Sequence, residues 1–228
     1  MEILAIPIIA CVLASGQAHA TAQYPDIIFY KGEKHSLHDN PMDAYFDKHP
    51  EKKPKGGITS TALWRGYVAS FEFKEKNLVL KDIKIQTWDR SSEESEWKSV
   101  RDQIVPANED LIIDWHSGLL TLPHGELVEY VHMGYLSSYS NYILLEIENG
   151  VLMEERSFTL KEFNDFKKRQ FAAFKKTEDY DKAVKEYMDQ GVDPKEIDGY
   201  IERSILYYTD EFLVEPAKAQ VDAPEAGK

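Results

Sequence analysis

The chain has 228 residues, with 27 Lys and Arg against 40 Asp and Glu, so its formal net charge is −13. A mean hydropathy of −0.48 is typical of a globular protein rather than a bundle of membrane helices, and no membrane span is predicted. Binding to nucleic acid requires clustered Lys and Arg against phosphate, which so acidic a chain does not favour. The single cysteine excludes an intramolecular disulfide and a thiolate zinc site.

Residues 1–20 have the pattern of a secretory signal peptide. An apolar run from Ile3 to Leu13 precedes Ala18-His19-Ala20, an A-x-A cleavage site. The run is too short to span a bilayer, which needs about 20 apolar residues. Cleavage near Ala20 predicts a periplasmic or secreted protein without cysteine. No Lys or Arg precedes the run, so a start further upstream stays open. Ile8-Ile9-Ala10-Cys11 loosely resembles a lipoprotein motif, which the missing basic residue does not favour unless the start lies upstream.

Residues 21–158 carry the short apolar runs and turn signals of a β-rich body. Asp26–Tyr30 predicts a strand, Lys31-Gly32 a turn, and Glu33–Leu37 the returning strand. We expect a polar loop from His38 to Gly57, where prolines and a Gly-Gly pair interrupt the pattern.

Two further hairpins are predicted in this body. Ala62–Phe73 and Leu78–Trp88 are rich in aromatic and β-branched residues and are joined by a short loop. The other hairpin turns at Asn149-Gly150, a pair suited to a type I′ turn because both positions need a positive φ. Weaker signals lie between the hairpins: a charged stretch expected as a solvated loop or short helix start, a β segment and two turns (Asp89–Asp102, Leu111–Ile113, Ser117-Gly118, Pro123–Gly125).

From Thr159 the apolar period changes from two to 3.6, so residues 159–215 predict about three helices packed on the β body. The first helix begins with the capping box Thr159-Leu160-Lys161-Glu162. The second follows Thr177 or Asp179 and stops at Gly191, and the third begins at Asp193-Pro194, which combines an N-cap with proline at N1.

The predicted fold class is therefore α+β, with an antiparallel β-rich N-terminal body of hairpins followed by about three C-terminal helices. Residues 216–228 contain Pro, Ala, Gly and charged residues and predict a disordered tail. Within the β body, residues 66–71 resemble residues 134–139, and each segment precedes a predicted hairpin. The similarity indicates either two related β modules or a chance match in a tyrosine-rich chain.

Asp114-Trp115-His116-Ser117 is the segment whose residue types best suit catalysis. A Ser-His-Asp device needs three converging side chains, and neighbours on one strand point to alternate faces, so a strand end followed by a turn is the favoured interpretation. Asp114 and His116 stay weak catalytic candidates. His35 and His38 are weak metal-ligand candidates, because a loop but not a strand would bring them together. No cofactor is predicted.

Arg65, Trp64 and Trp115 are the candidate binding residues. Arg65 lies in a strand-like run, where a charge must reach the surface, pair with an acid or contact a ligand, and pairing is the favoured outcome. Exposed aromatic rings bind sugars or proteins, but a β protein also uses such rings in its core. For Trp64 and Tyr67 the core is the favoured position.

Three functions from different classes follow from these features. The favoured prediction is an exported, non-enzymatic binding protein of periplasmic type, acting as an inhibitor or immunity-like protein against a basic partner that suits its acidity. The first alternative is a periplasmic hydrolase whose site includes Asp114, His116 and Arg65. The second is a carbohydrate-binding module that uses a row of exposed Trp and Tyr side chains.

Overall fold

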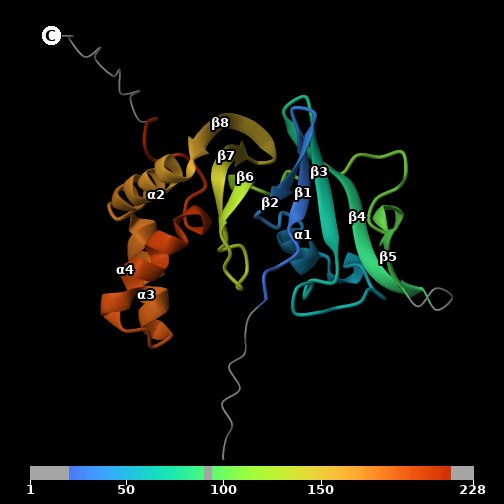
Figure 1. Ribbon diagram of the computed structural model, residues 1–228, viewed down its shortest axis with the longest axis horizontal. Helices are drawn as coiled ribbons and strands as arrows, with labels where there is room; N and C mark the ends of the chain where they lie inside the picture. Colours follow the sequence, from blue (N-terminus) through green and yellow to red (C-terminus); the bar gives the residue numbers. More distant parts are fainter. Residues whose placement is uncertain (1–20, 90–93, 217–228) are drawn as a thin grey trace, which may run out of the picture.

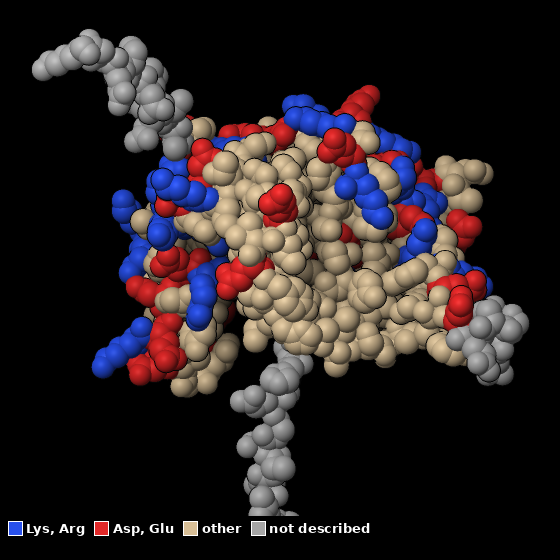
Figure 2. Space-filling view, in the orientation of Figure 1, with Lys and Arg blue, Asp and Glu red and all other residues tan. Residues whose placement is uncertain are grey.

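The computed structural model describes residues 21–89 and 94–216 (Figure 1 and Figure 2). The predicted signal peptide, Cys11 and nearly all of the predicted tail lie outside these residues. Within them, no helix is long and apolar enough to cross a membrane. The α+β class is confirmed, since an eight-stranded sheet precedes three C-terminal helices (Figure 1).

The strands form one sheet in the order β2-β1-β3-β4-β8-β7-β6, with β5 paired to β4 beside this path. Every pairing is antiparallel except that of β1 with β3. The strands are β1 (Asp26–Tyr30), β2 (Glu33–Leu37), β3 (Val68–Lys74), β4 (Asn77–Asp89), β5 (Glu94–Ser99), β6 (Gly118–Glu129), β7 (Ser138–Glu148) and β8 (Val151–Thr159).

All three predicted hairpins are present, and local turn residues position them. Lys31 and Gly32 have φ of 51° and 83°, and Asn149 and Gly150 have φ of 47° and 79°, as a type I′ turn requires. The third hairpin joins β3 to β4, with Lys74 opposite Asn77. These short connections place consecutive strands side by side at little cost in loop closure.

The β3–β4 and β7–β8 hairpins meet at their turns. Asn77 pairs with Val151, and the Leu78 N–H donates to the carbonyl of Gly150 at 2.8 Å. The strand that pairs with the outer side of each hairpin differs in direction. β1 runs parallel to β3, whereas β6 runs antiparallel to β7. The two similar segments, residues 66–71 and 134–139, thus each lead into a hairpin of similar position. A common origin of the two β modules stays a prediction.

The sheet curves until its two ends approach each other. The His38 N–H, just past β2, donates to the carbonyl of Thr121 in β6 at 2.9 Å. The main hydrophobic core fills the inside of this curve, with fully buried side chains from strands at both ends of the sheet, such as Ile28, Phe71, Leu120 and Leu145. Burial of such side chains supplies most of the driving force for folding.

Three helices lie beside the β6–β7 end of the sheet, at the left of Figure 1; the first packs on the other face of the strands, and the other two pack on it and on each other. They are α2 (Leu160–Phe174), α3 (Glu178–Asp189) and α4 (Pro194–Arg203). The predicted caps are confirmed, because Thr159 and Glu162 form both bonds of the capping box and the Asp193 side chain accepts from the Lys195 N–H. Phe163 and Phe166 of α2 pack on Tyr142 and Leu144 of β7, which fixes the helices to the sheet.

Three expectations about connecting segments are wrong. The expected loop from His38 to Gly57 contains a helix, α1 (Asp43–Lys48), whose Phe46 enters the core, and a 3-10 turn at Pro50–Lys52. The end of the charged stretch forms β5, which pairs with β4 although all six residues are exposed. Pro123–Gly125 is not a turn, because β6 continues through it with a register shift after His124. A proline is tolerated there because β6 is the last strand in the order, an edge strand of the sheet.

Candidate functional site

Arg65 is buried and paired with Asp26, the outcome that the sequence favours. Its Nη1 lies 2.9 Å from Oδ2 of Asp26 and its Nη2 lies 3.1 Å from Oδ1, which is the two-pronged geometry of a guanidinium and a carboxylate. The Ala69 N–H also donates to Asp26 at 2.8 Å. The run around Arg65 is not a strand, because β3 begins only at Val68 and the residues before it form turns.

The remaining guanidinium contacts tie separate segments together. Nη2 of Arg65 donates to the Tyr24 carbonyl at 3.2 Å and contacts the Tyr135 hydroxyl at 3.4 Å. The Tyr135 hydroxyl donates to Oδ1 of Asn40 at 3.0 Å, and its ring stacks on His38 with centroids 4.7 Å apart. These contacts make Arg65 a structural anchor, and its role in binding a ligand stays a prediction.

Burial is the largest single influence on the pKa values of this network. It raises the pKa of Asp26 to about 6, although Arg65 and the Ala69 N–H favour the ionised carboxylate. Burial works against the charge of Arg65, but the Asp26 carboxylate overcomes it and the pKa of Arg65 is raised. Burial lowers the pKa of His38 to about 4. Burial also raises the pKa of Asp39. Among the nearby charges, His116 opposes this rise most strongly.

The side chains of residues 114–117 diverge toward different partners. Trp115 donates its indole N–H to the Pro41 carbonyl at 2.8 Å and packs on Tyr45, so it belongs to the edge of the core. Asp114 is exposed, and the Ser117 hydroxyl accepts from the Asn149 N–H at 2.9 Å. Nε2 of His116 is buried without a hydrogen-bond partner among the described residues. Asp114 and His116 therefore share no hydrogen bond with a nucleophile here, and the hydrolase stays an untested alternative.

The two histidines suggested as metal ligands have separate surroundings. His35 lies 3.8 Å from a carboxylate oxygen of Glu33, with its ring 6.1 Å from that of His124. His38 instead stacks on Tyr135. Within residues 21–89 and 94–216, no group of three or more His, Cys, Asp or Glu is placed to hold a metal ion.

Trp64 is 60% exposed, so its expected place in the core is wrong, whereas Tyr67 is fully buried as expected. The reason is local, because residues 62–66 form turns and the alternation of a strand does not apply to them. Trp88 and Trp97, on β4 and β5, are also exposed. A surface role for tryptophan thus stays open at three positions.

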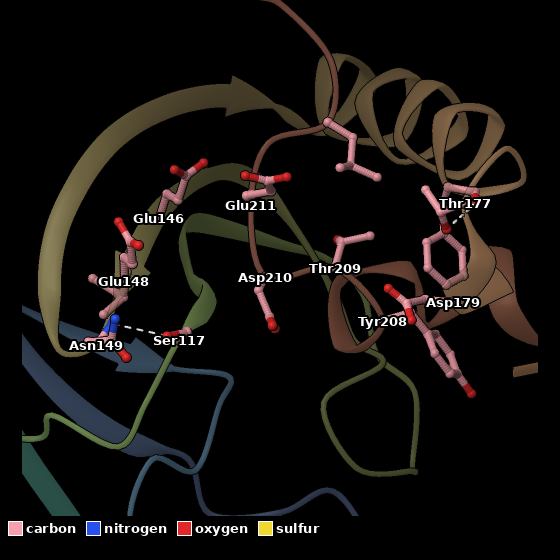
Figure 3. Close-up of a pocket in the computed structure, with 13 residues that line it drawn as sticks. Ser117, Glu146, Glu148, Asn149, Thr177, Asp179, Tyr208, Thr209, Asp210 and Glu211 are labelled. Carbon is pink, nitrogen blue, oxygen red and sulfur yellow. Dashed lines mark hydrogen bonds between the residues drawn. The ribbon is translucent and has the colours of Figure 1, made fainter. Parts of the chain in front are cut away.

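An acidic pocket of about 510 Å³ lies between the β7–β8 turn, the α2–α3 connection and the chain after α4 (Figure 3). This acidic pocket is lined by Ser117, Glu146, Ile147, Glu148, Asn149, Phe174, Thr177, Asp179, Tyr208, Thr209, Asp210, Glu211 and Leu213. Five of these residues are acidic, and neither Lys nor Arg is among them. The volume is in the range of small-ligand sites, about 300–1,000 Å³.

Hydrogen bonds fix the walls of the acidic pocket. The Phe212 N–H donates to Oε2 of Glu146 at 2.7 Å, which joins the chain after α4 to β7. The buried Gln170 amide donates to the carbonyl of Glu211 at 2.7 Å and accepts from the Leu213 N–H at 3.0 Å. In Figure 3, Glu146 and Glu148 come from one wall, Asp179 from the opposite wall, and Asp210 and Glu211 from the chain between them.

The acidic side chains differ in how far they are engaged. Asp179 forms an ion pair with Lys182 at 2.7 Å, and Glu146 accepts the bond from Phe212. Glu148, Asp210 and Glu211 form no side-chain hydrogen bond or ion pair with other residues that the structure describes. Three carboxylates are thus available to a ligand.

Sequence reasoning missed the acidic pocket entirely. Its acids come from segments up to 65 residues apart, and 40 acids in the chain give no signal that singles them out. Comparison with known proteins gives no further guide, because no family model, curated protein or solved structure matches this chain.

Proposed function

We propose that this protein is a binding protein that docks a basic partner at the acidic pocket. The observation that carries the proposal is the lining itself, in which five acidic residues gather without Lys or Arg. Like charges brought together at one site repel each other, and a bound cation relieves that repulsion. Glu148, Asp210 and Glu211 supply the free carboxylates.

The apolar part of the lining suits the side chains of Arg and Lys. Ile147, Phe174 and Leu213 lie in the same pocket as the carboxylates. Arg and Lys pack their methylene stems on apolar surface while their charged heads stay among polar groups. A guanidinium also matches a carboxylate with two parallel hydrogen bonds, so arginine is the preferred ligand residue.

The spread of the acids favours an extended cation over a metal ion. A bound Ca²⁺ takes six to eight oxygen ligands at about 2.3–2.6 Å. The carboxylates of the described chain form no cluster of that kind. A basic protein surface or peptide with several charged groups fits such spacing.

The net charge of −13 supports the same kind of partner. A field of one sign attracts an oppositely charged protein and raises the association rate more than the affinity. With the predicted signal peptide, this gives an exported binding protein, with inhibition of a cationic toxin or hydrolase as its proposed role. Intact mass of the secreted product tests the export, since cleavage after Ala20 leaves Thr21 as the first residue.

Calorimetric titration with a hexa-arginine peptide tests the acidic pocket. We expect the triple variant Glu148→Gln/Asp210→Asn/Glu211→Gln to bind about tenfold or more weakly, since each lost charged contact removes roughly a kcal/mol or more. The matched control Asp47→Asn/Glu129→Gln/Asp165→Asn changes three exposed acids outside the pocket and alters net charge equally. Equal weakening of both variants would mean that net charge alone attracts the peptide, and the proposal would fail.

A further inference from the structure

A second site, a groove in which lysines outnumber acids, lies on the outer face of the sheet. Its volume is about 630 Å³ and it crosses strands β2, β1, β3 and β4. Ile27 lies at its centre, opposite Ser36 of β2 on one side and Ser70 of β3 on the other. Side chains two residues apart share a face, so Phe29 extends this row along β1. The core residue Ile28 points to the opposite face.

Aromatic rings form one end of this groove. Trp97 of β5 lies edge-to-face on Tyr24, with centroids 5.9 Å apart, and the two rings are 40% and 47% exposed. Both line the groove with Phe29 and the buried Val68. Such rings offer flat apolar faces together with a polar edge.

Lysines surround the apolar floor of the groove. Lys34 comes from β2 and Lys81 and Lys84 from β4, whereas Asp82 is the sole acid in the lining. Lys81 pairs with Glu72, and Lys84 lies 3.6 Å from Asp82. Lys34 takes part in no ion pair within the described part of the chain. An excess of lysine in so acidic a protein is a local feature that complements an anionic ligand.

We propose that this groove binds an acidic polysaccharide. Trp97 and Tyr24 stack on the apolar faces of sugar rings, and the three lysines pair with the carboxylate or sulfate groups of the chain. Single-stranded nucleic acid also combines stacking with anionic contacts, and its charge per unit is close to that of an acidic polysaccharide, so a thymidine oligomer is the competing ligand in the test. The groove is separate from the acidic pocket, so this inference does not depend on the proposed function.

Titration calorimetry with defined oligosaccharides tests the proposal. The probes are a polygalacturonate octamer, a heparin octamer, a cello-oligosaccharide of equal length and a thymidine 8-mer. We expect binding of one or both acidic glycans, with the preference between them distinguishing carboxylate from sulfate. Trp97→Ala should weaken that binding about tenfold or more, as loss of one stacking contact does. Lys34→Ala/Lys81→Ala/Lys84→Ala should weaken it more than Trp97→Ala does and lower its salt dependence.

Matched controls separate the groove from general surface effects. Trp88→Ala removes an exposed tryptophan that does not line the groove, and Lys161→Ala/Lys168→Ala/Lys195→Ala removes three exposed lysines of α2 and α4. Both controls should bind within about twofold of wild type, with unchanged circular dichroism for every variant. Binding that is absent, that prefers the thymidine or neutral probe, or that the controls weaken as much as the groove variants, would overturn the proposal.

Discussion

Arg65 and Asp26 form a bidentate ion pair inside the protein, joining the start of β1 to the turn before β3. Both side chains are almost completely excluded from solvent. Asp26 also accepts the Ala69 N–H, so the pair fixes the entry of two neighbouring strands at once. The pair is costly to bury, and each partner compensates for the other.

Asp26→Asn should therefore lower the free energy of unfolding by about 3–5 kcal/mol, because it leaves the Arg65 charge buried and uncompensated. Urea denaturation at pH 7 measures the loss. The double variant Asp26→Leu/Arg65→Met should lose less than Asp26→Asn alone, since no charge then remains in the interior. As a control, Lys185→Ala breaks an exposed pair with Asp189 and should change stability little. A double variant less stable than the single would contradict this account.

His38 should make the protein less stable in mild acid. Its pKa is lowered from 6.5 to about 4 by burial, so the unfolded chain takes up a proton that the folded protein refuses. The contribution of His38 to the free energy of unfolding is complete above pH 6.5. It is lost as the pH falls toward 4, by up to about 1.4 kcal/mol per pH unit.

Urea denaturation of wild type and His38→Gln at pH 7.5 and pH 5 tests this expectation. The raised pKa of Asp26 acts in the opposite direction, since the folded protein gains that proton first, and so the comparison between the two proteins carries the result. Wild type should lose about 1–2 kcal/mol more than His38→Gln between these pH values. Equal losses would mean that His38 titrates normally.

Gly150 should tolerate no side chain. Its φ of 79° disfavours other residues, and a Cβ there would lie 2.6 Å from the carbonyl oxygen of Ile113. Gly32 has a φ of 83° but open space around its Cβ position. Gly32→Ala should thus cost about 1 kcal/mol from backbone strain alone, and Gly150→Ala clearly more, measured by thermal and urea unfolding. Equal costs would show that the contact with Ile113 relaxes freely.

These glycines illustrate how much of the fold the sequence predicts. The turn at Asn149-Gly150 and the caps at Thr159 and Asp193 depend on adjacent residues, so the local pattern predicts them correctly. The contact of Gly150 with Ile113 joins residues 37 positions apart and has no local signal. The same distinction explains Trp64, whose apolar neighbours suggested a strand where the chain makes turns.

The candidate sites follow the same logic. The sequence predicts that Arg65 needs a partner, because a charge in an apolar run is costly wherever it occurs. It does not predict that the partner is Asp26, 39 residues away at the start of β1. The acidic pocket and the groove on the outer face of the sheet are each assembled from four or more segments. Only folding brings those segments together.

Gln170 should hold the acidic pocket in shape. This fully buried side chain donates to Thr209 and to the Glu211 carbonyl, and its Oε1 accepts from the Leu213 N–H. Gln170→Leu leaves those backbone groups without partners, at a cost of about 1–3 kcal/mol. The chain after α4 should then exchange its amide hydrogens faster at residues 209–213.

The same variant connects the fold to the proposed function. Because Asp210 and Glu211 lie on the released segment, Gln170→Leu should also weaken hexa-arginine binding, although no acid is changed. Gln190→Leu, at the exposed end of α3, is the matched control and should leave both exchange and binding unaltered. If exchange at 209–213 accelerates while hexa-arginine affinity stays the same, the peptide does not need Asp210 and Glu211 in place. The carboxylates of β7 would then have to hold the basic partner without them.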